Sequence, residues 1–188
     1  MKKIILTIMT LASFSVAANY DIKPSDIKIQ WTAFKTAKKI GVNGTFDKIM
    51  YDIPNKKDRS TLVKALKKAK ATIQAVNLNI GDNKLKYDNV YSTLFKSMKT
   101  DTIEATIYDL IEGEGGIGTI LLEVKMNKRN NKIPMQYQIK DNVLIARGVL
   151  DMLDFNLGKS RKALVKKYGA YHEGVTWTQV NLELSIKL

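Results

Sequence analysis

Apolar and polar residues alternate with a period of two along most of this chain. Between residues 27 and 33, Ile, Ile, Trp and Ala alternate with Lys, Gln and Thr. The same alternation returns at 133–139 and 144–150, and Asp141 and Asn142 form a two-residue turn between these segments. Because successive side chains of a β-strand point to opposite faces, the pattern predicts strands with one apolar and one polar face.

Several such strands follow one another with short turns between them, which favours antiparallel pairing. About eight strands of this kind close into a barrel, and closure removes the exposed sheet edges. Helical spacing of apolar residues interrupts the alternation at 58–70, 87–98 and 156–168. We therefore predict a mainly β fold, a closed antiparallel, lipocalin-like β-barrel of about eight strands with two or three short helices.

The first eighteen residues have the pattern of a secretory signal peptide. Lys2 and Lys3 precede an apolar segment, 4–16, and Ala17 and Ala18 provide a small-residue cleavage site. No later segment is apolar over the length needed to span a bilayer. We expect residues 1–18 to be removed and residues 19–188 to form one domain that resides in the periplasm.

The composition limits the chemistry that this domain can perform. The chain has no cysteine, so its hydrophobic core must stabilise it without disulfides, and thiol chemistry is excluded. A single histidine, His172, excludes a metal site with two histidines. The net charge of +13 fits transient contact with an anionic membrane surface, but the even spread of lysines favours solubility alone.

Two further motifs suggest chemistry that their context does not support. Residues 113–118, GEGGIG, match the dinucleotide-binding fingerprint letter for letter, but a strand-like run follows where that motif needs a helix. We interpret the segment as a glycine-rich hairpin turn. His172 beside Glu173 would suit hydrolysis, but a lone histidine next to a turn and a tryptophan is more often structural.

Two segments resemble the YceI-like family of small periplasmic lipid-binding proteins. The run WTAFKTAKKIGVNGTF, residues 31–46, is similar to the family's second and third strands. The run YHEGVTW, residues 171–177, is similar to its closing motif, with a His, a Gly and a Trp before the last strand. The resemblance covers nearly all of the chain after the first twenty or so residues. It implies a barrel that holds a long isoprenoid or fatty chain.

Small residues on the presumed inner face are a second indication of a cavity. These residues are Ala33, Gly44, Ala105, Ala146 and Gly148. They leave volume in the lumen unfilled, or they fit a taper that Trp31, Phe46 and Tyr137 fill. The alternation alone leaves both interpretations open, and the family resemblance favours the cavity.

We expect the lumen to bind a long-chain amphiphilic lipid: a polyisoprenoid, an isoprenoid quinone, or a fatty acid or amide. The residues that parity places around its tail are Trp31, Phe46, Ile107, Val124, Met135, Tyr137 and Leu150, with Phe95 and Phe155 closing the ends. Tyr137 offers a hydroxyl for a head group. We assign no catalytic residue, no metal ligand and no cofactor other than this lipid.

Two other functions compete with lipid binding. An enzyme acting on such a lipid or quinone is the alternative, and only His172 is available to it. A barrel that binds nucleic acid is less favoured, because charge alone supports it and the export signal opposes it. The sequence leaves the natural lipid and the formation of a homodimer open.

Overall fold

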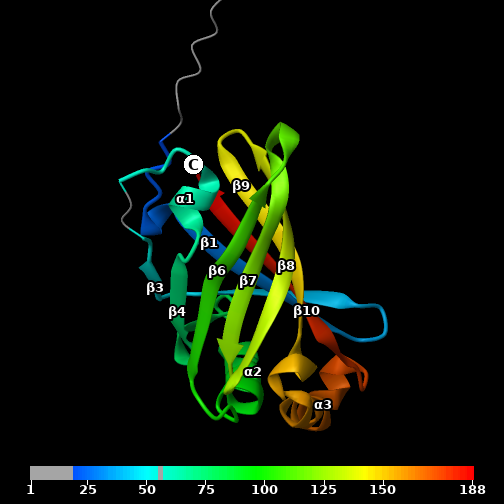
Figure 1. The fold of residues 1–188 in the computed structure, drawn as a ribbon. Helices are drawn as coiled ribbons and strands as arrows, with labels where there is room; N and C mark the ends of the chain where they lie inside the picture. Colours follow the sequence, from blue (N-terminus) through cyan, green and yellow to red (C-terminus); the bar gives the residue numbers. More distant parts are fainter. Residues whose placement is uncertain (1–18, 55–56) are drawn as a thin grey trace, which may run out of the picture.

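The computed structural model describes residues 19–54 and 57–188, and these are mainly β (Figure 1). Among them, ten strands form one antiparallel sheet in the order β3-β4-β6-β7-β8-β9-β10-β1-β2-β5. The strands are β1 (Ile27–Lys35), β2 (Ile40–Phe46), β3 (Ile49–Asp52), β4 (Lys70–Gln74), β5 (Leu78–Asn79), β6 (Thr102–Glu112), β7 (Ile117–Met126), β8 (Arg129–Lys140), β9 (Val143–Asp151) and β10 (Thr176–Lys187). The predicted signal peptide lies outside the described residues.

The sheet is strongly curled, so that β1 and β10 cross behind β6, β7 and β8 (Figure 1). Within the described residues its hydrogen-bonded ladder does not close, because it ends at β3 on one side and β5 on the other. β3 has four residues and β5 only two, which leaves little backbone for closing pairs. A side chain bridges part of the opening, since the Tyr51 hydroxyl of β3 donates to the Ile27 carbonyl of β1 at 3.4 Å.

The predicted mainly β, antiparallel architecture is therefore confirmed, and three α-helices accompany it among the described residues. Two details of the prediction differ from the structure. The strands number ten rather than about eight, and the curled sheet is open rather than closed. Alternation identifies the longer strands but does not show which two edges meet.

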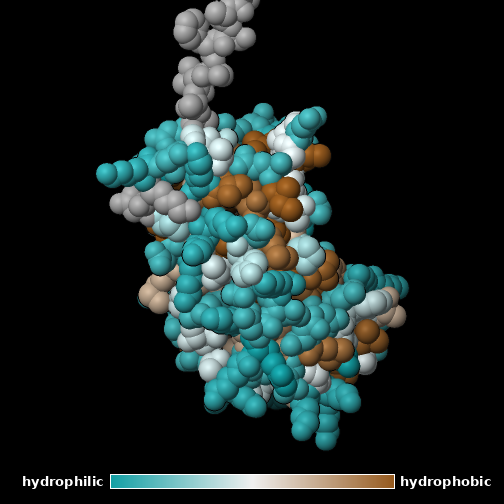
Figure 2. Space-filling view, in the orientation of Figure 1, coloured by the Kyte–Doolittle hydropathy of each residue, from teal (hydrophilic) through white to brown (hydrophobic). Residues whose placement is uncertain are grey.

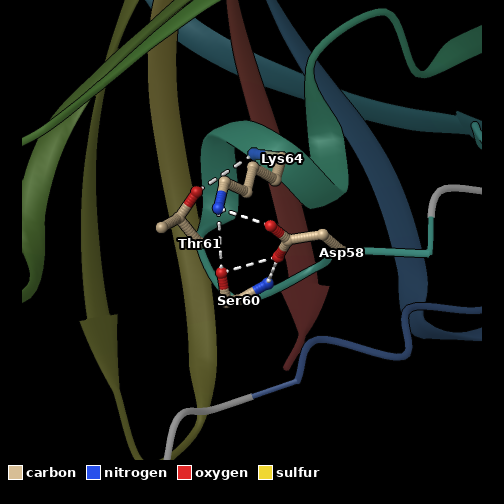
Figure 3. A network of polar contacts seen from close by, with 4 residues as sticks. All are labelled: Asp58, Ser60, Thr61 and Lys64. Atoms are coloured by element: carbon tan, nitrogen blue, oxygen red, sulfur yellow. Dashed lines mark hydrogen bonds and ion pairs between the residues drawn. The ribbon is translucent and has the colours of Figure 1, made fainter.

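The first helix, α1 (Leu62–Leu66), is shorter than the segment of helical spacing at 58–70. Thr61 Oγ1 accepts a hydrogen bond from the Lys64 backbone N–H at 3.2 Å and so caps the helix. Asp58 and Ser60 precede it. The Asp58 carboxylate accepts from the Ser60 N–H and hydroxyl, and Lys64 Nζ lies 2.6 Å from the same carboxylate (Figure 3).

The sheet ends α1 early. The Lys68 N–H donates to the Ile107 carbonyl of β6 at 2.8 Å, and the Ile107 N–H donates to the Ala69 carbonyl at 2.9 Å. These bonds take residues after Leu66 into the ladder between β4 and β6. Pairing with a long neighbouring strand thus overrides the helical spacing of this segment.

The other two helices lie together at the opposite end of the sheet from α1 (Figure 1). They are α2 (Lys84–Val90), which continues into a π-helical turn (Tyr91–Phe95), and α3 (Gly158–His172). Asn83 caps α2, since its side-chain oxygen accepts from the Lys86 N–H at 2.9 Å. The helices therefore cover one end of the curled sheet.

Two predicted turns are confirmed. The glycine-rich segment joins β6 to β7, with positive φ of 66° at Gly115 and 74° at Gly116, a conformation that glycine adopts without strain. Asp141 and Asn142 join β8 to β9 with φ of 50° and 62°. Positive φ at both central residues is the requirement of the tight hairpin turn that follows the twist of the strands.

The core lies inside the curled sheet, with α1 at one end and the 3₁₀ turn Met152–Phe155 at the other. Its largest fully buried side chains are Phe155, Leu62, Leu66, Ile120, Met135, Leu144 and Ile186. Figure 2 shows hydrophilic side chains over much of the face in view, with hydrophobic ones in a band across its upper half and beside α3. Within residues 19–54 and 57–188, no helix is both long enough and apolar enough to cross a membrane.

Candidate ligand-binding cavity

The curled sheet encloses a cavity of about 430 Å³. This volume falls within the range of small-molecule pockets, about 300–1,000 Å³. Strands on both sides of the curl supply its walls, including Ile29 of β1, Leu122 of β7 and Val180 of β10. Because alternate side chains of each strand point inward, the walls are almost entirely apolar. Residues of α2, the π-helical turn and α3 line the cavity at one end.

Seven of the nine predicted ligand-binding residues line this cavity. They are Trp31, Phe46, Phe95, Ile107, Val124, Met135 and Leu150. Phe46 comes from β2 and Phe95 from the π-helical turn, and their rings pack edge to face with centroids 6.2 Å apart. This contact packs the π-helical turn against β2.

The other two predicted residues, Tyr137 and Phe155, are buried but do not belong to the cavity wall. Tyr137 covers Gly118, its partner across β7 and β8, where an added Cβ would lie 2.5 Å from the Tyr137 ring. Phe155 is fully buried in the short 3₁₀ turn before α3, and its carbonyl accepts from Asn127 Nδ2 at 2.8 Å. The Tyr137 hydroxyl is therefore not placed to bind a head group in the cavity.

Of the five small residues on the predicted inner face, some line the cavity and others are packed outside its wall. Ala33 and Ala105 line the cavity, and Ala146 is fully buried outside its wall. Gly44 lies under the ring of Trp31, and an added Cβ there would come within 2.1 Å of the indole. Gly148 similarly accommodates Met135, whose Cγ would lie 2.8 Å from an added Cβ. Because a large side chain occupies the space over each of these two glycines, neither leaves free volume.

The two segments that carry the family resemblance contact each other at the helical end of the cavity. Trp177 Nε1 donates to the Thr36 carbonyl at 2.9 Å, and the Thr36 N–H donates to the Val175 carbonyl at 3.0 Å. Lys39 Nζ lies 5.1 Å from the centre of a Trp177 ring. The closing segment, 171–177, therefore supports the hairpin between β1 and β2.

His172 lines the cavity at this end. Its Nδ1 lies 2.6 Å from the Thr176 hydroxyl oxygen, so its bond is to a side chain rather than to a backbone carbonyl. Burial lowers the pKa of His172 below its usual value of 6.5, and the positive charge of Lys35 lowers this pKa further. The imidazole is therefore mainly neutral at pH 7.

Trp31 has a polar atom that the protein itself does not satisfy. Its Nε1 is buried, and it has no hydrogen-bond partner among the described residues. A buried N–H without an acceptor costs free energy. Trp31 is a wall residue, so a bound molecule with an oxygen near this depth would supply the acceptor.

Sequence reasoning missed part of the wall. Leu122 and Leu182 follow the same parity as Val124 and Val180, so alternation contained the signal for both. The wall residues of α2 carried no such signal. They are Asn83, Leu85, Lys86, Asn89 and Val90, counting the cap, and only the docking of the helix on the sheet brings them to the cavity.

The described residues include no group of three His, Asp or Glu side chains that could hold a metal ion. Lys70, a wall residue of β4, forms an ion pair of 2.8 Å with Glu104, and this contact lowers the pKa of Glu104. The cavity is thus an apolar binding chamber with a few charged residues in its wall.

Several solved structures are similar to this architecture over most of their length. BcnA of Burkholderia cenocepacia has a TM-score of 0.60 and 13% sequence identity, with 88% of this chain and 98% of BcnA covered. A polyisoprenoid-binding domain from Saccharophagus degradans, implicated in plant cell wall breakdown, also has a TM-score of 0.60 at 13% identity, with 85% and 91% covered. No family model matches the sequence, and no curated protein does.

A YceI protein of Campylobacter jejuni is similar over an even larger share of the chain. Its TM-score is 0.59 at 13% identity, and the similarity covers 97% of this chain and 98% of that one. The chain therefore has the fold of the YceI proteins. The resemblance noted in the sequence is confirmed at the level of the fold.

Proposed function

We propose that this protein binds a long-chain amphiphilic lipid in its cavity and transports it in the periplasm. The lipid classes that fit are a polyisoprenoid, an isoprenoid quinone, and a fatty acid or amide. The observation that carries the proposal is the apolar wall around about 430 Å³ of space. The similarity to a structure described as a polyisoprenoid-binding domain supports the same ligand class.

Burial of the apolar tail is the main source of affinity for such a ligand. Each buried methylene contributes about 0.8 kcal/mol, so ten contribute roughly 8 kcal/mol. Association costs of the order of 4–15 kcal/mol in lost freedom. Because the gain from burial grows with each added methylene, longer tails that still fit bind more tightly. Selectivity then follows tail length and shape. The unsatisfied Trp31 N–H adds one specific contact, because an oxygen of the ligand would accept from it.

Contact with an anionic membrane is the second part of the proposal, and α3 is the element that suits it. Its exposed lysines are Lys159, Lys162, Lys166 and Lys167, and none forms an ion pair within the described part of the chain. The helix contains no acidic residue, and Tyr171 near its end is 65% exposed. Since Tyr171 also lines the cavity, a membrane bound at α3 would lie close to the cavity.

The test is the identity of the lipid that copurifies with the protein. Mass spectrometry of solvent extracts from natively purified protein should show a long-chain amphiphile. Ala105→Phe should lose most of it, because Ala105 lines the cavity on β6 and the added ring occupies volume that the tail needs.

The matched control is Thr106→Phe, one residue along on the opposite face of β6 and outside the cavity wall. It should retain its lipid. Both variants must first give the far-ultraviolet circular dichroism and cooperative unfolding of the unmodified protein. A folded Ala105→Phe variant with a full load of lipid would show that the cavity is not the binding site.

A further inference from the structure

In the described part of the chain, the cavity wall contains three lysines and one carboxylate, and these four residues differ in whether they form an ion pair. Lys70 forms its ion pair with Glu104, and Glu183, the only carboxylate in the wall within the described residues, lies 2.8 Å from Arg147. Lys35 and Lys86 also line the cavity, and neither forms an ion pair within residues 19–54 and 57–188. Two positive charges of the wall are therefore uncompensated.

Both uncompensated lysines belong to the helical end of the cavity. Lys35 is the last residue of β1, and Lys86 lies in α2, which covers this end. Lys35 is half-buried, and its charge acts on the nearby His172, whose pKa it lowers. Two amide side chains, Asn83 and Asn89, line the same end and supply further N–H donors.

We propose that the lipid carries an anionic head group, a carboxylate or a phosphate, held at the helical end between Lys35 and Lys86. This inference rests on the proposed function, because it places the tail in the apolar part of the cavity. An anion there compensates both lysines and accepts charge-assisted hydrogen bonds. A cationic head group meets uncompensated positive charge, and an uncharged one gains no ion pair.

Three probes with a ten-carbon chain separate the head group from the tail. They are decanoate, 1-decanol and decyltrimethylammonium, titrated by calorimetry into the delipidated mature chain at low ionic strength. Decanoate should bind most tightly and decyltrimethylammonium least. Acetate, which carries the charge without a tail, should not compete with decanoate, and this separates a lipid head group from a free anion.

Two substitutions assign the preference to the proposed residues. Lys35→Gln and Lys86→Gln should each weaken decanoate binding by about two- to fivefold, the usual size for a partly exposed ion pair. Together they should remove most of the difference between decanoate and decanol. The matched control is Lys28→Gln, on the same strand as Lys35 but outside the cavity wall.

The outcomes distinguish this inference from the function on which it rests. If the unmodified chain binds decanoate and decanol equally, or the double variant keeps the full preference, the lysines do not select the head group and the inference is wrong. If the unmodified chain binds none of the three tailed probes, the proposed function fails, and the inference fails with it. Competition by acetate at low concentration would show a site for small anions instead.

Discussion

At the scale of single residues, three glycines each accommodate one large inward side chain on the neighbouring strand. Gly44 is paired with Trp31, Gly118 with Tyr137, and Gly148 with Met135, and in each case the two residues are direct cross-strand partners. The missing Cβ lets the large side chain lie flat on the sheet. Glycine on this inner face therefore marks where a neighbour is packed.

Gly44→Ala should destabilise the protein by about 1–3 kcal/mol, the usual cost of overpacking a well-packed site. The added Cβ would lie within 2.1 Å of the rigid Trp31 ring, so the indole must move out of its position. Urea unfolding followed by circular dichroism measures the change. Gly169→Ala is the control, because nothing lies within 4 Å of its added Cβ, and it should be neutral or stabilising. An unchanged midpoint for Gly44→Ala would contradict this packing.

A second prediction at this scale concerns His172. Burial and the charge of Lys35 lower its pKa in the folded state. The unfolded chain then binds more protons near pH 6, so this contribution to stability is complete above about pH 6.5 and is lost as the pH falls toward the folded pKa. The free energy of unfolding should decrease between pH 7 and pH 5. His172→Gln should make this decrease smaller.

The protein's single histidine makes the pKa directly measurable. An NMR titration should give one histidine C2–H resonance with a pKa below 6.5, and Lys35→Gln should raise that pKa. A pKa at or above 6.5 would contradict the burial of the ring. His172→Gln should also bind lipid within a few-fold of the unmodified protein. If the substitution instead abolishes a measurable turnover in a folded protein, the protein is an enzyme that acts on the lipid, and the proposal of transport is wrong.

At the scale of elements, the lysines of α1 and α3 differ in what surrounds them. Lys64 pairs with Asp58 at 2.6 Å, and Lys67 at the end of α1 pairs with Asp109 at 2.8 Å, which lowers the pKa of each carboxyl group. The four exposed lysines of α3 have no carboxylate partner within the described residues. Pairing, rather than the number of lysines, makes α3 the more suitable helix for an anionic surface.

Replacing Lys159, Lys162, Lys166 and Lys167 with glutamine should weaken binding to vesicles of mixed neutral and anionic lipid. Each lysine near such a surface contributes about 1 kcal/mol, and added salt should remove the effect by screening. Vesicle cosedimentation measures it. A control variant with the same loss of charge replaces Lys28, Lys48, Lys140 and Lys187, which are exposed on other elements. Equal loss of binding in both variants would show that only net charge matters.

At the scale of the whole molecule, the described residues form a folded unit that begins after the predicted signal peptide. The Tyr20 N–H donates to the Arg59 carbonyl at 3.1 Å, and Ile22 is buried in the core, so the chain is packed from about residue 20 onward. The chain has no cysteine, so this folded unit depends on its hydrophobic core without disulfides. Export and periplasmic residence remain predictions.

The mature protein should begin near Asn19 and should be recovered from the periplasmic fraction. The intact mass of the purified protein measures the cleavage position, and fractionation locates it. A variant with Lys2 and Lys3 replaced by glutamate should be exported less efficiently, because a positive n-region is part of the signal. Recovery of full-length protein that retains Met1, or its retention in the cytosol, would contradict the prediction.

The sequence by itself determined the longer strands, two of the turns and the facing of most of their side chains. Alternation identified the inward residues of β1, β7 and β10, because the pleat of a strand is a local property. The hairpin at Asp141 and Asn142 was equally predictable, because two residues set its geometry. Seven of nine predicted residues lie in the cavity wall for this reason.

Only the tertiary structure decided which inward side chains border free space and which fill it. Parity places Tyr137 and Trp31 on the same inner face, and both pack against a cross-strand glycine, but only Trp31 borders the cavity. The open edge of the sheet, the end covered by α2 and the uncompensated charges of Lys35 and Lys86 likewise depend on residues far apart in sequence. Alternation reports the direction of a side chain, whereas a cavity is set by what the neighbouring elements leave unfilled.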